Sequence, residues 1–149
     1  MQKIWKIERI EQMKSIGKII SSLLFPNTLL FLTGELGSGK TTLTKFISRH
    51  LNIKSKIQSP TFSILKQYPI CFNKKRTFFN HFDLFRLKKE KELIKLLKNL
   101  KELTFENINV IEWGKNDPDF YKWIKTPGFL IIQLEIRQIN DKRIIKIKY

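Results

Sequence analysis

The spacing of apolar residues along this chain predicts helices in some segments and strands in others. In residues 8–25 apolar positions recur every three or four residues, which places them on one stripe of a helix that Pro26 ends. Residues 28–32 form a short uninterrupted apolar run, which is typical of a buried parallel strand. A second helical pattern covers residues 40–52, so the first third of the chain is expected to contain a helix, a strand and a helix.

The rest of the chain continues to alternate between strand and helix patterns. Pro60 disfavours helix, so residues 56–62 are expected to form a loop, and residues 88–103 are expected to form a helix. Further strands are expected at residues 63–70, 77–85, 109–113, 129–136 and 143–149, with turns at 72–76 and 138–141. We therefore predict a single α/β domain over residues 1–149, with a mainly parallel sheet flanked by helices and antiparallel strands at its C-terminal edge.

The composition narrows the class of protein. Hydrophobic residues make up 42% of the chain, including 12 phenylalanines, which is typical of a folded domain. Charges interrupt the apolar residues of the N-terminus, and no apolar run approaches the roughly 20 residues of a membrane span, so we expect neither a signal peptide nor a transmembrane helix. Cys71 is the only cysteine, which excludes an internal disulfide and favours a cytoplasmic protein. We expect Cys71 to be a buried or semi-buried small hydrophobic residue.

The net charge of +16 has two interpretations. Such a charge would attract RNA, DNA or an anionic membrane. The lysines are nevertheless scattered through every segment, together with many Ile, Asn and Phe residues. AT-rich codons encode all of these residue types, so genome composition would produce the same bias. The sequence leaves the two interpretations open.

A glycine-rich segment follows the first predicted strand. Residues 34–41, GELGSGKT, match the pattern G-x-x-x-x-G-K-[ST], with an apolar strand before it and an amphipathic helix after it. Glycines let the backbone wrap a phosphate, Lys40 would neutralise its oxygens, and the Thr41 hydroxyl would ligate magnesium. This predicts a P-loop NTPase domain that binds a triphosphate and Mg²⁺.

Two acidic residues are candidates for the rest of a phosphoryl-transfer site. Glu112 ends a short apolar strand, which suits a carboxylate close to a metal ion. Asp83 lies among aromatic residues in the segment HFDLFRL, where an acid is usually paired or coordinating.

The sequence does not assign a single role to each of five further residues. Arg86 is either a salt-bridge partner or a phosphate contact, and Trp113 either packs in the core or flanks the nucleotide. His81 is expected to be a structural hydrogen-bonding residue rather than a base. Ser59 and Thr61 lie in a proline-containing loop that either senses the γ-phosphate or forms a plain turn.

Taken in order, the segments GELGSGKTT, SPTF, HFDLFRL and IEW resemble the bacterial TsaE family, the small ATPase of tRNA threonylcarbamoyladenosine biosynthesis. The resemblance extends from the first strand to Trp113. It implies an ATPase that works with the threonylcarbamoyl transferase TsaD and its partner TsaB. In that role ATP binding and hydrolysis support repeated turnover in modification of the adenosine beside the anticodon of ANN-decoding tRNAs.

The resemblance also implies roles for individual residues. Thr41 and Glu112 would ligate magnesium, while Asp83 and Glu112, with Lys40, would act in hydrolysis. Residues 37–42 would hold the phosphates, Ser59 and Thr61 would lie in a switch-like loop, and Trp113 would lie near the nucleotide and the partner surface. The chain departs from the family pattern in having no glycine in KELIKLLKNLKEL and in having Gly114 after Glu-Trp.

Three other functions were weighed against this one. A small-molecule P-loop kinase would need a lid carrying several arginines, and arginine is scarce in this chain. A GTPase would normally carry Asn-Lys-x-Asp, which residues 114–117 match only in scrambled form. A basic RNA-binding module with a structural P-loop would bind RNA with a steep salt dependence and without regard to ATP.

Overall fold

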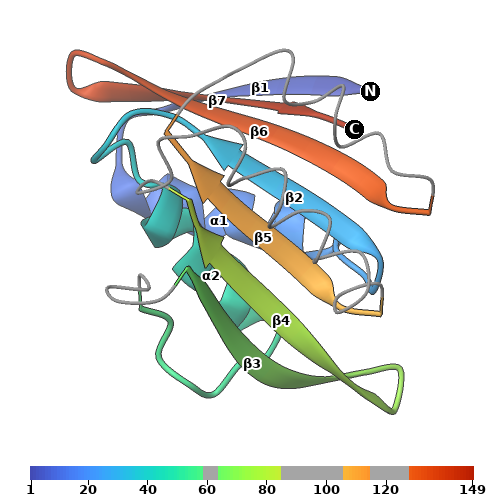
Figure 1. Ribbon diagram of the computed structural model, residues 1–149. Helices are drawn as coiled ribbons and strands as arrows, with labels where there is room; N and C mark the ends of the chain where they lie inside the picture. The colour runs from blue at the N-terminus through green and yellow to red at the C-terminus, as the bar shows by residue number, and fades with distance from the viewer. Residues whose placement is uncertain (59–63, 85–105, 115–127) are drawn as a thin grey trace.

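In the part of the chain that the structure describes, seven strands form one sheet, in the order β1-β7-β6-β2-β5-β4-β3 (Figure 1). The computed structural model describes residues 1–58, 64–84, 106–114 and 128–149. The elements in these ranges are β1 (Gln2–Ile7), α1 (Ile10–Ser21), β2 (Thr28–Thr33), α2 (Lys40–His50), β3 (Leu65–Phe72), β4 (Lys75–Asp83), β5 (Ile108–Trp113), β6 (Leu130–Ile139) and β7 (Lys142–Lys148).

The four strands at the centre of the sheet, β6, β2, β5 and β4, run parallel to one another. Both edges are antiparallel, with β7 and β1 beyond β6, and β3 beyond β4. The parallel centre and the antiparallel strands at the C-terminal edge agree with the prediction, but the sheet has further antiparallel pairs that were not predicted. Two features of the chain explain the difference: β3 folds back on β4 as a hairpin, and β1, which was not predicted, pairs with β7 from Gln2↔Lys148 to Ile7↔Arg143.

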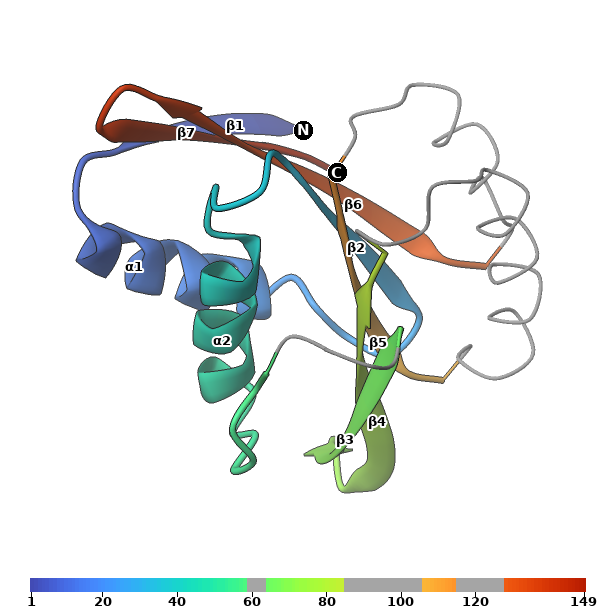
Figure 2. The same cartoon turned by 60° about the vertical axis from the view of Figure 1, so that its left-hand side comes forward.

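The sheet separates two groups of buried side chains. Leu30 and Leu32 of β2 pack on the face that α1 and α2 cover, whereas Leu29 and Phe31 pack on the opposite face. Both helices lie on the same side of the sheet (Figure 2). This alternation follows from the period of two in a strand, and it explains why all six residues of β2 are buried. The α/β fold class is confirmed, because helices and strands share one core.

Most predicted elements are present, with boundaries that differ by a few residues. The first helix was expected at residues 8–25 and covers Ile10–Ser21. The expected turn at 72–76 contracts to Asn73 and Lys74, both with positive φ. The flanking strands keep their predicted lengths but each reaches two residues closer to the turn. The predicted helix at 88–103 and most of the loop at 56–62 lie outside the described residues. No helix in the described part of the chain combines the length and apolar character that crossing a membrane would require.

The burial predicted for Cys71 was wrong, because its side chain is exposed. Cys71 lies in the edge strand β3, where Tyr68 and Ile70 are the buried positions. Since side chains of a strand alternate between two faces, a residue next to Ile70 points away from the core.

Gly17 allows α1 and α2 to pack closely. A Cβ atom at this position would lie 2.7 Å from Cβ of Phe46 and 3.2 Å from its carbonyl carbon. Alanine in a helix is about 1 kcal/mol more favourable than glycine, but overpacking a core costs about 1–3 kcal/mol. We expect Gly17→Ala to lower the free energy of unfolding by about 1 kcal/mol, which corresponds to about 3 °C in Tm. Thermal and urea unfolding, with the exposed Lys18→Ala as control, would check this; an unchanged Tm would show that the helices separate easily.

Candidate functional site

A glycine-rich loop connects β2 to α2 at the carboxyl end of β2. Gly37 and Gly39 in this loop have φ angles of 79° and 106°, a conformation that glycine adopts without steric cost. Gly39 is the N-cap of α2, which begins at Lys40. The first N–H groups of a helix have no partner within the helix, and the helix dipole places partial positive charge there. The loop and the start of α2 can therefore bind an anion.

The side chain of Lys40 lies against the same loop. Its Nζ atom donates hydrogen bonds to the backbone oxygens of Gly34 at 2.7 Å and Glu35 at 2.8 Å, and only 8% of the residue is exposed. Burial lowers the pKa of the Lys40 ammonium, and the negative charges of Glu112 and Asp83 oppose this shift. An ammonium has three N–H donors, so one remains for an anion bound at the loop.

Glu112 is held by three hydrogen bonds from two elements. The Thr41 hydroxyl donates to Oε2 at 2.7 Å, and the Thr44 hydroxyl donates to Oε1 at 2.8 Å. His81 Nε2 lies 2.7 Å from Oε1, and because a carboxylate can only accept, Nε2 carries the hydrogen. Glu112, Thr44 and His81 are each at most 2% exposed. A buried carboxylate with this set of donors keeps one orientation, toward the start of α2.

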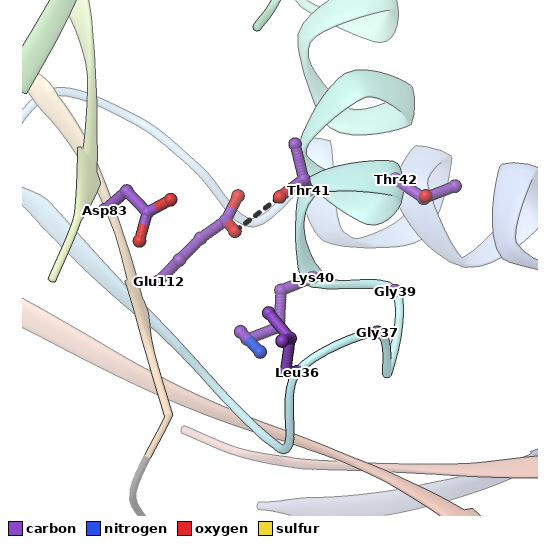
Figure 3. A pocket seen from close by; sticks show the side chains of 8 residues that line it. All are labelled: Leu36, Gly37, Gly39, Lys40, Thr41, Thr42, Asp83 and Glu112. Carbon is purple, nitrogen blue, oxygen red and sulfur yellow. Dashed lines mark hydrogen bonds between the residues drawn. The ribbon is translucent and has the colours of Figure 1, made fainter. Parts of the chain in front are cut away.

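Asp83 reaches the same site from the end of β4. It pairs with Glu112 in the parallel register of β4 and β5, and both carboxylates are directed toward the first turn of α2 (Figure 3). The pocket between them and the glycine loop has a volume of about 240 Å³. It is lined by Leu36, Gly37, Gly39, Lys40, Thr41, Thr42, Asp83 and Glu112.

The oxygen atoms around this pocket fit magnesium better than a transition metal. The oxygens of Thr41 and Glu112 that share a hydrogen bond are hard ligands of the kind Mg²⁺ prefers. Among the described residues, no group of three or more His, Cys, Asp or Glu side chains could hold a metal ion by itself. Magnesium in phosphate sites commonly uses one or two protein ligands and completes its shell with water and phosphate oxygens. The residues present therefore fit an ion that is bound together with phosphates.

Comparison with known protein families gives the same assignment as the sequence motifs. The family model "Threonylcarbamoyl adenosine biosynthesis protein TsaE" matches residues 7–145. The chain belongs to the TsaE family.

Individual relatives support this assignment. The tRNA threonylcarbamoyladenosine biosynthesis protein TsaE of Rickettsia typhi is 33% identical to this chain, over 93% of the chain and 89% of that protein. The TsaE protein of Rickettsia felis is also 33% identical, over 89% of the chain and 72% of that protein. The crystal structure of Bacillus subtilis YdiB has a TM-score of 0.63 at 23% identity, covering 99% of this chain and 84% of YdiB. That structure shows a similar fold. The TsaE names place the family in tRNA threonylcarbamoyladenosine biosynthesis.

Most residues singled out from the TsaE-like motifs come together in the structure. Gly37, Gly39, Lys40, Thr41 and Thr42 line the pocket with Asp83 and Glu112. Ser38, also predicted to contact phosphate, has a buried side chain and does not line the pocket. His81 makes the hydrogen bond that was expected of it. Ser59, Thr61 and Arg86 lie outside the described residues.

The sequence left open whether Trp113 packs in the core or flanks the nucleotide, and the structure places it in the core. Its side chain is 9% exposed and packs with Phe31, Phe82 and Ile111 on the face of the sheet away from the helices. It is not among the residues that line the pocket. The TsaE resemblance also implies a place for Trp113 near the nucleotide and the partner surface, and this stays a prediction.

Sequence reasoning missed Thr44 and Leu36. Thr44 is buried and donates a hydrogen bond to Glu112. Its position one helical turn after Thr41, on the same face of the predicted helix, was the sequence signal that could have identified it. Leu36 lines the pocket yet is 77% exposed, and its place inside the G-x-x-x-x-G-K-[ST] pattern was the available signal.

Proposed function

We propose that this chain is a magnesium-dependent ATPase with a P-loop NTPase fold, which supports the threonylcarbamoyl transferase complex of TsaD and TsaB. The modified position would be the adenosine next to the tRNA anticodon. One observation carries the ATPase proposal: the Thr41 hydroxyl and the Glu112 carboxylate meet in the same pocket as the glycine loop and Lys40. Family membership carries the role in threonylcarbamoyladenosine synthesis.

The phosphates would bind between the glycine loop and Lys40. The N–H groups at the start of α2 supply partial positive charge, and the Lys40 ammonium supplies a full positive charge and its remaining N–H donor. The pocket volume of about 240 Å³ is below the roughly 300–1,000 Å³ of typical small-molecule sites. This size suits a site that encloses the phosphates and leaves the rest of the nucleotide outside the pocket.

Thr41 and Glu112 would hold magnesium, which when bound neutralises charge on the phosphate oxygens. The hydrogen bond from Thr41 to Glu112 would then be replaced, but Thr44 and His81 would still hold Glu112 in place through its other oxygen. Asp83, on the neighbouring strand, would accept a hydrogen bond from the attacking water and orient it. Catalysis would then rest on positioning and charge neutralisation, with no covalent intermediate on the protein.

The decisive experiment measures ATP hydrolysis by the purified chain alone, with TsaD and TsaB from the same organism, and with tRNA added. We expect slow hydrolysis that the partners stimulate and that Lys40→Ala removes. Phosphoryl transfer to a small acceptor in place of water would indicate a kinase. RNA binding that is steeply salt-dependent, in a chain that does not bind ATP, would indicate an RNA-binding module. Either result would contradict the proposed function.

A further inference from the structure

Arg143 contacts the glycine loop from a strand near the end of the chain. It lies on β7, on the face of the sheet that packs against α1 and α2, since Ile145 and Ile147 at alternate positions belong to that core. Its Nε atom donates a hydrogen bond to the backbone oxygen of Ser38 at 3.1 Å. A Cβ placed on Gly39 would lie 3.7 Å from the same Nε atom. Arg143 is therefore packed directly behind the peptide group that joins Ser38 to Gly39.

This hydrogen bond sets the orientation of that peptide group. The described residues contain no cis peptide bond, and in a trans peptide the C=O and N–H groups point in opposite directions. Because the Ser38 oxygen points toward Arg143, the Gly39 N–H points away from it. Gly37, Gly39 and Lys40 all line the pocket, and no described residue accepts a hydrogen bond from the Gly39 N–H. If the peptide flipped, it would present an oxygen to a bound phosphate and repel it.

A buried side chain of α1 also packs behind the glycine loop. Met13 of α1 is fully buried, and its Cε atom would lie 3.2 Å from a Cβ on Gly39. Glycine at φ 106° is free to change conformation, so packing alone does not select one peptide orientation. A charged donor at the Ser38 oxygen does select one, because a hydrogen bond from a charged donor is stronger than one between neutral groups.

We propose that Arg143 is a positioning residue for binding the polyphosphate of a nucleotide, an inference that rests on the proposed ATPase function. It holds the Ser38–Gly39 peptide with its N–H available to the phosphates, and it acts through the loop without touching them. Arg143 lies on β7, which pairs antiparallel with β6 outside the four parallel strands. The proposal therefore assigns a role in nucleotide binding to the antiparallel edge of the sheet.

The test compares two substitutions at Arg143 with one at its neighbour. Arg143→Met keeps an apolar stem and removes the donor, whereas Arg143→Lys keeps a charge and a donor. Lys142→Met is the matched control, because Lys142 is an exposed residue of the same strand that pairs with Glu8 at 2.7 Å. The measurements are the Kd of ATP by calorimetry, the KM and kcat of hydrolysis, and the Tm without nucleotide.

We expect Arg143→Met to raise the Kd and KM for ATP about tenfold or more. Its kcat should stay within about twofold of that of the unaltered chain. Arg143→Lys should have Kd and KM values between those of Arg143→Met and the unaltered chain. Lys142→Met should bind ATP as the unaltered chain does. Unchanged ATP binding in Arg143→Met, or a loss of kcat that follows a lower Tm, would overturn the inference while leaving the proposed function intact. An unaltered chain that binds no ATP would overturn the proposed function, and this inference with it.

Discussion

Lys40→Ala is expected to abolish productive nucleotide binding, raising the Kd for ATP at least about 100-fold, because charge-assisted hydrogen bonds to phosphate are among the strongest in proteins. The ammonium already makes two hydrogen bonds to carbonyls of the glycine loop. Without it, the oxygens of Gly34 and Glu35 lose their donor, so the loop would also lose an internal contact. Calorimetry with ATP measures the effect.

Two controls separate the charge of Lys40 from its bulk. Lys40→Met keeps the apolar stem and should fail to bind ATP as Lys40→Ala does. Lys45→Ala, on the exposed side of α2, removes a positive charge of the same helix and should bind ATP normally. ATP binding by Lys40→Ala within about threefold of the unaltered chain would contradict a cationic role for this residue.

The pH dependence of ATP binding follows from the same residue. Burial lowers the pKa of Lys40, so this lysine loses its proton at a lower pH than an exposed lysine does. The triphosphate needs the protonated form. The affinity of the unaltered chain for ATP should therefore fall as the pH rises into the alkaline range, which calorimetry at several pH values would measure.

The second large effect is expected from the two carboxylates, which should be needed for hydrolysis more than for binding. Asp83→Ala and Glu112→Ala should leave measurable ATP binding while kcat falls by about 100-fold or more, the usual effect of losing an acid–base or metal-positioning group. Glu112→Ala also removes the carboxylate that accepts from the buried Nε2–H of His81, which costs stability.

Isosteric variants remove that complication. Glu112→Gln and Asp83→Asn keep the size of each side chain and remove its charge, and Glu106→Gln, at an exposed position, is the matched control. Single-turnover hydrolysis and ATP binding without magnesium give the two readouts. Full hydrolytic activity in both the Asp83 and the Glu112 variants would contradict the roles proposed for them.

The sequence alone identified the parts of the site that neighbouring residues create. The glycine loop, the strand before it and the helix after it were predicted correctly, because backbone freedom, apolar spacing and helix N-termini are local properties. Glu112 and Asp83 were also found as candidates, Glu112 because it follows a short apolar strand pattern and Asp83 because aromatic residues surround it. Parallel strands align their carboxyl ends, and this brought both residues to the pocket.

The tertiary structure decided everything that depends on partners distant in the sequence. It paired β1 with β7 across the whole chain, exposed Cys71 at an edge, and directed Thr44 and His81 to Glu112. It also brought Arg143 to Ser38, 105 residues away. Such contacts form only when burial of the complete sheet offsets the entropy of closing long loops. No local pattern of residues predicts whether burial will offset this loss of entropy, so these contacts could be identified only from the folded chain.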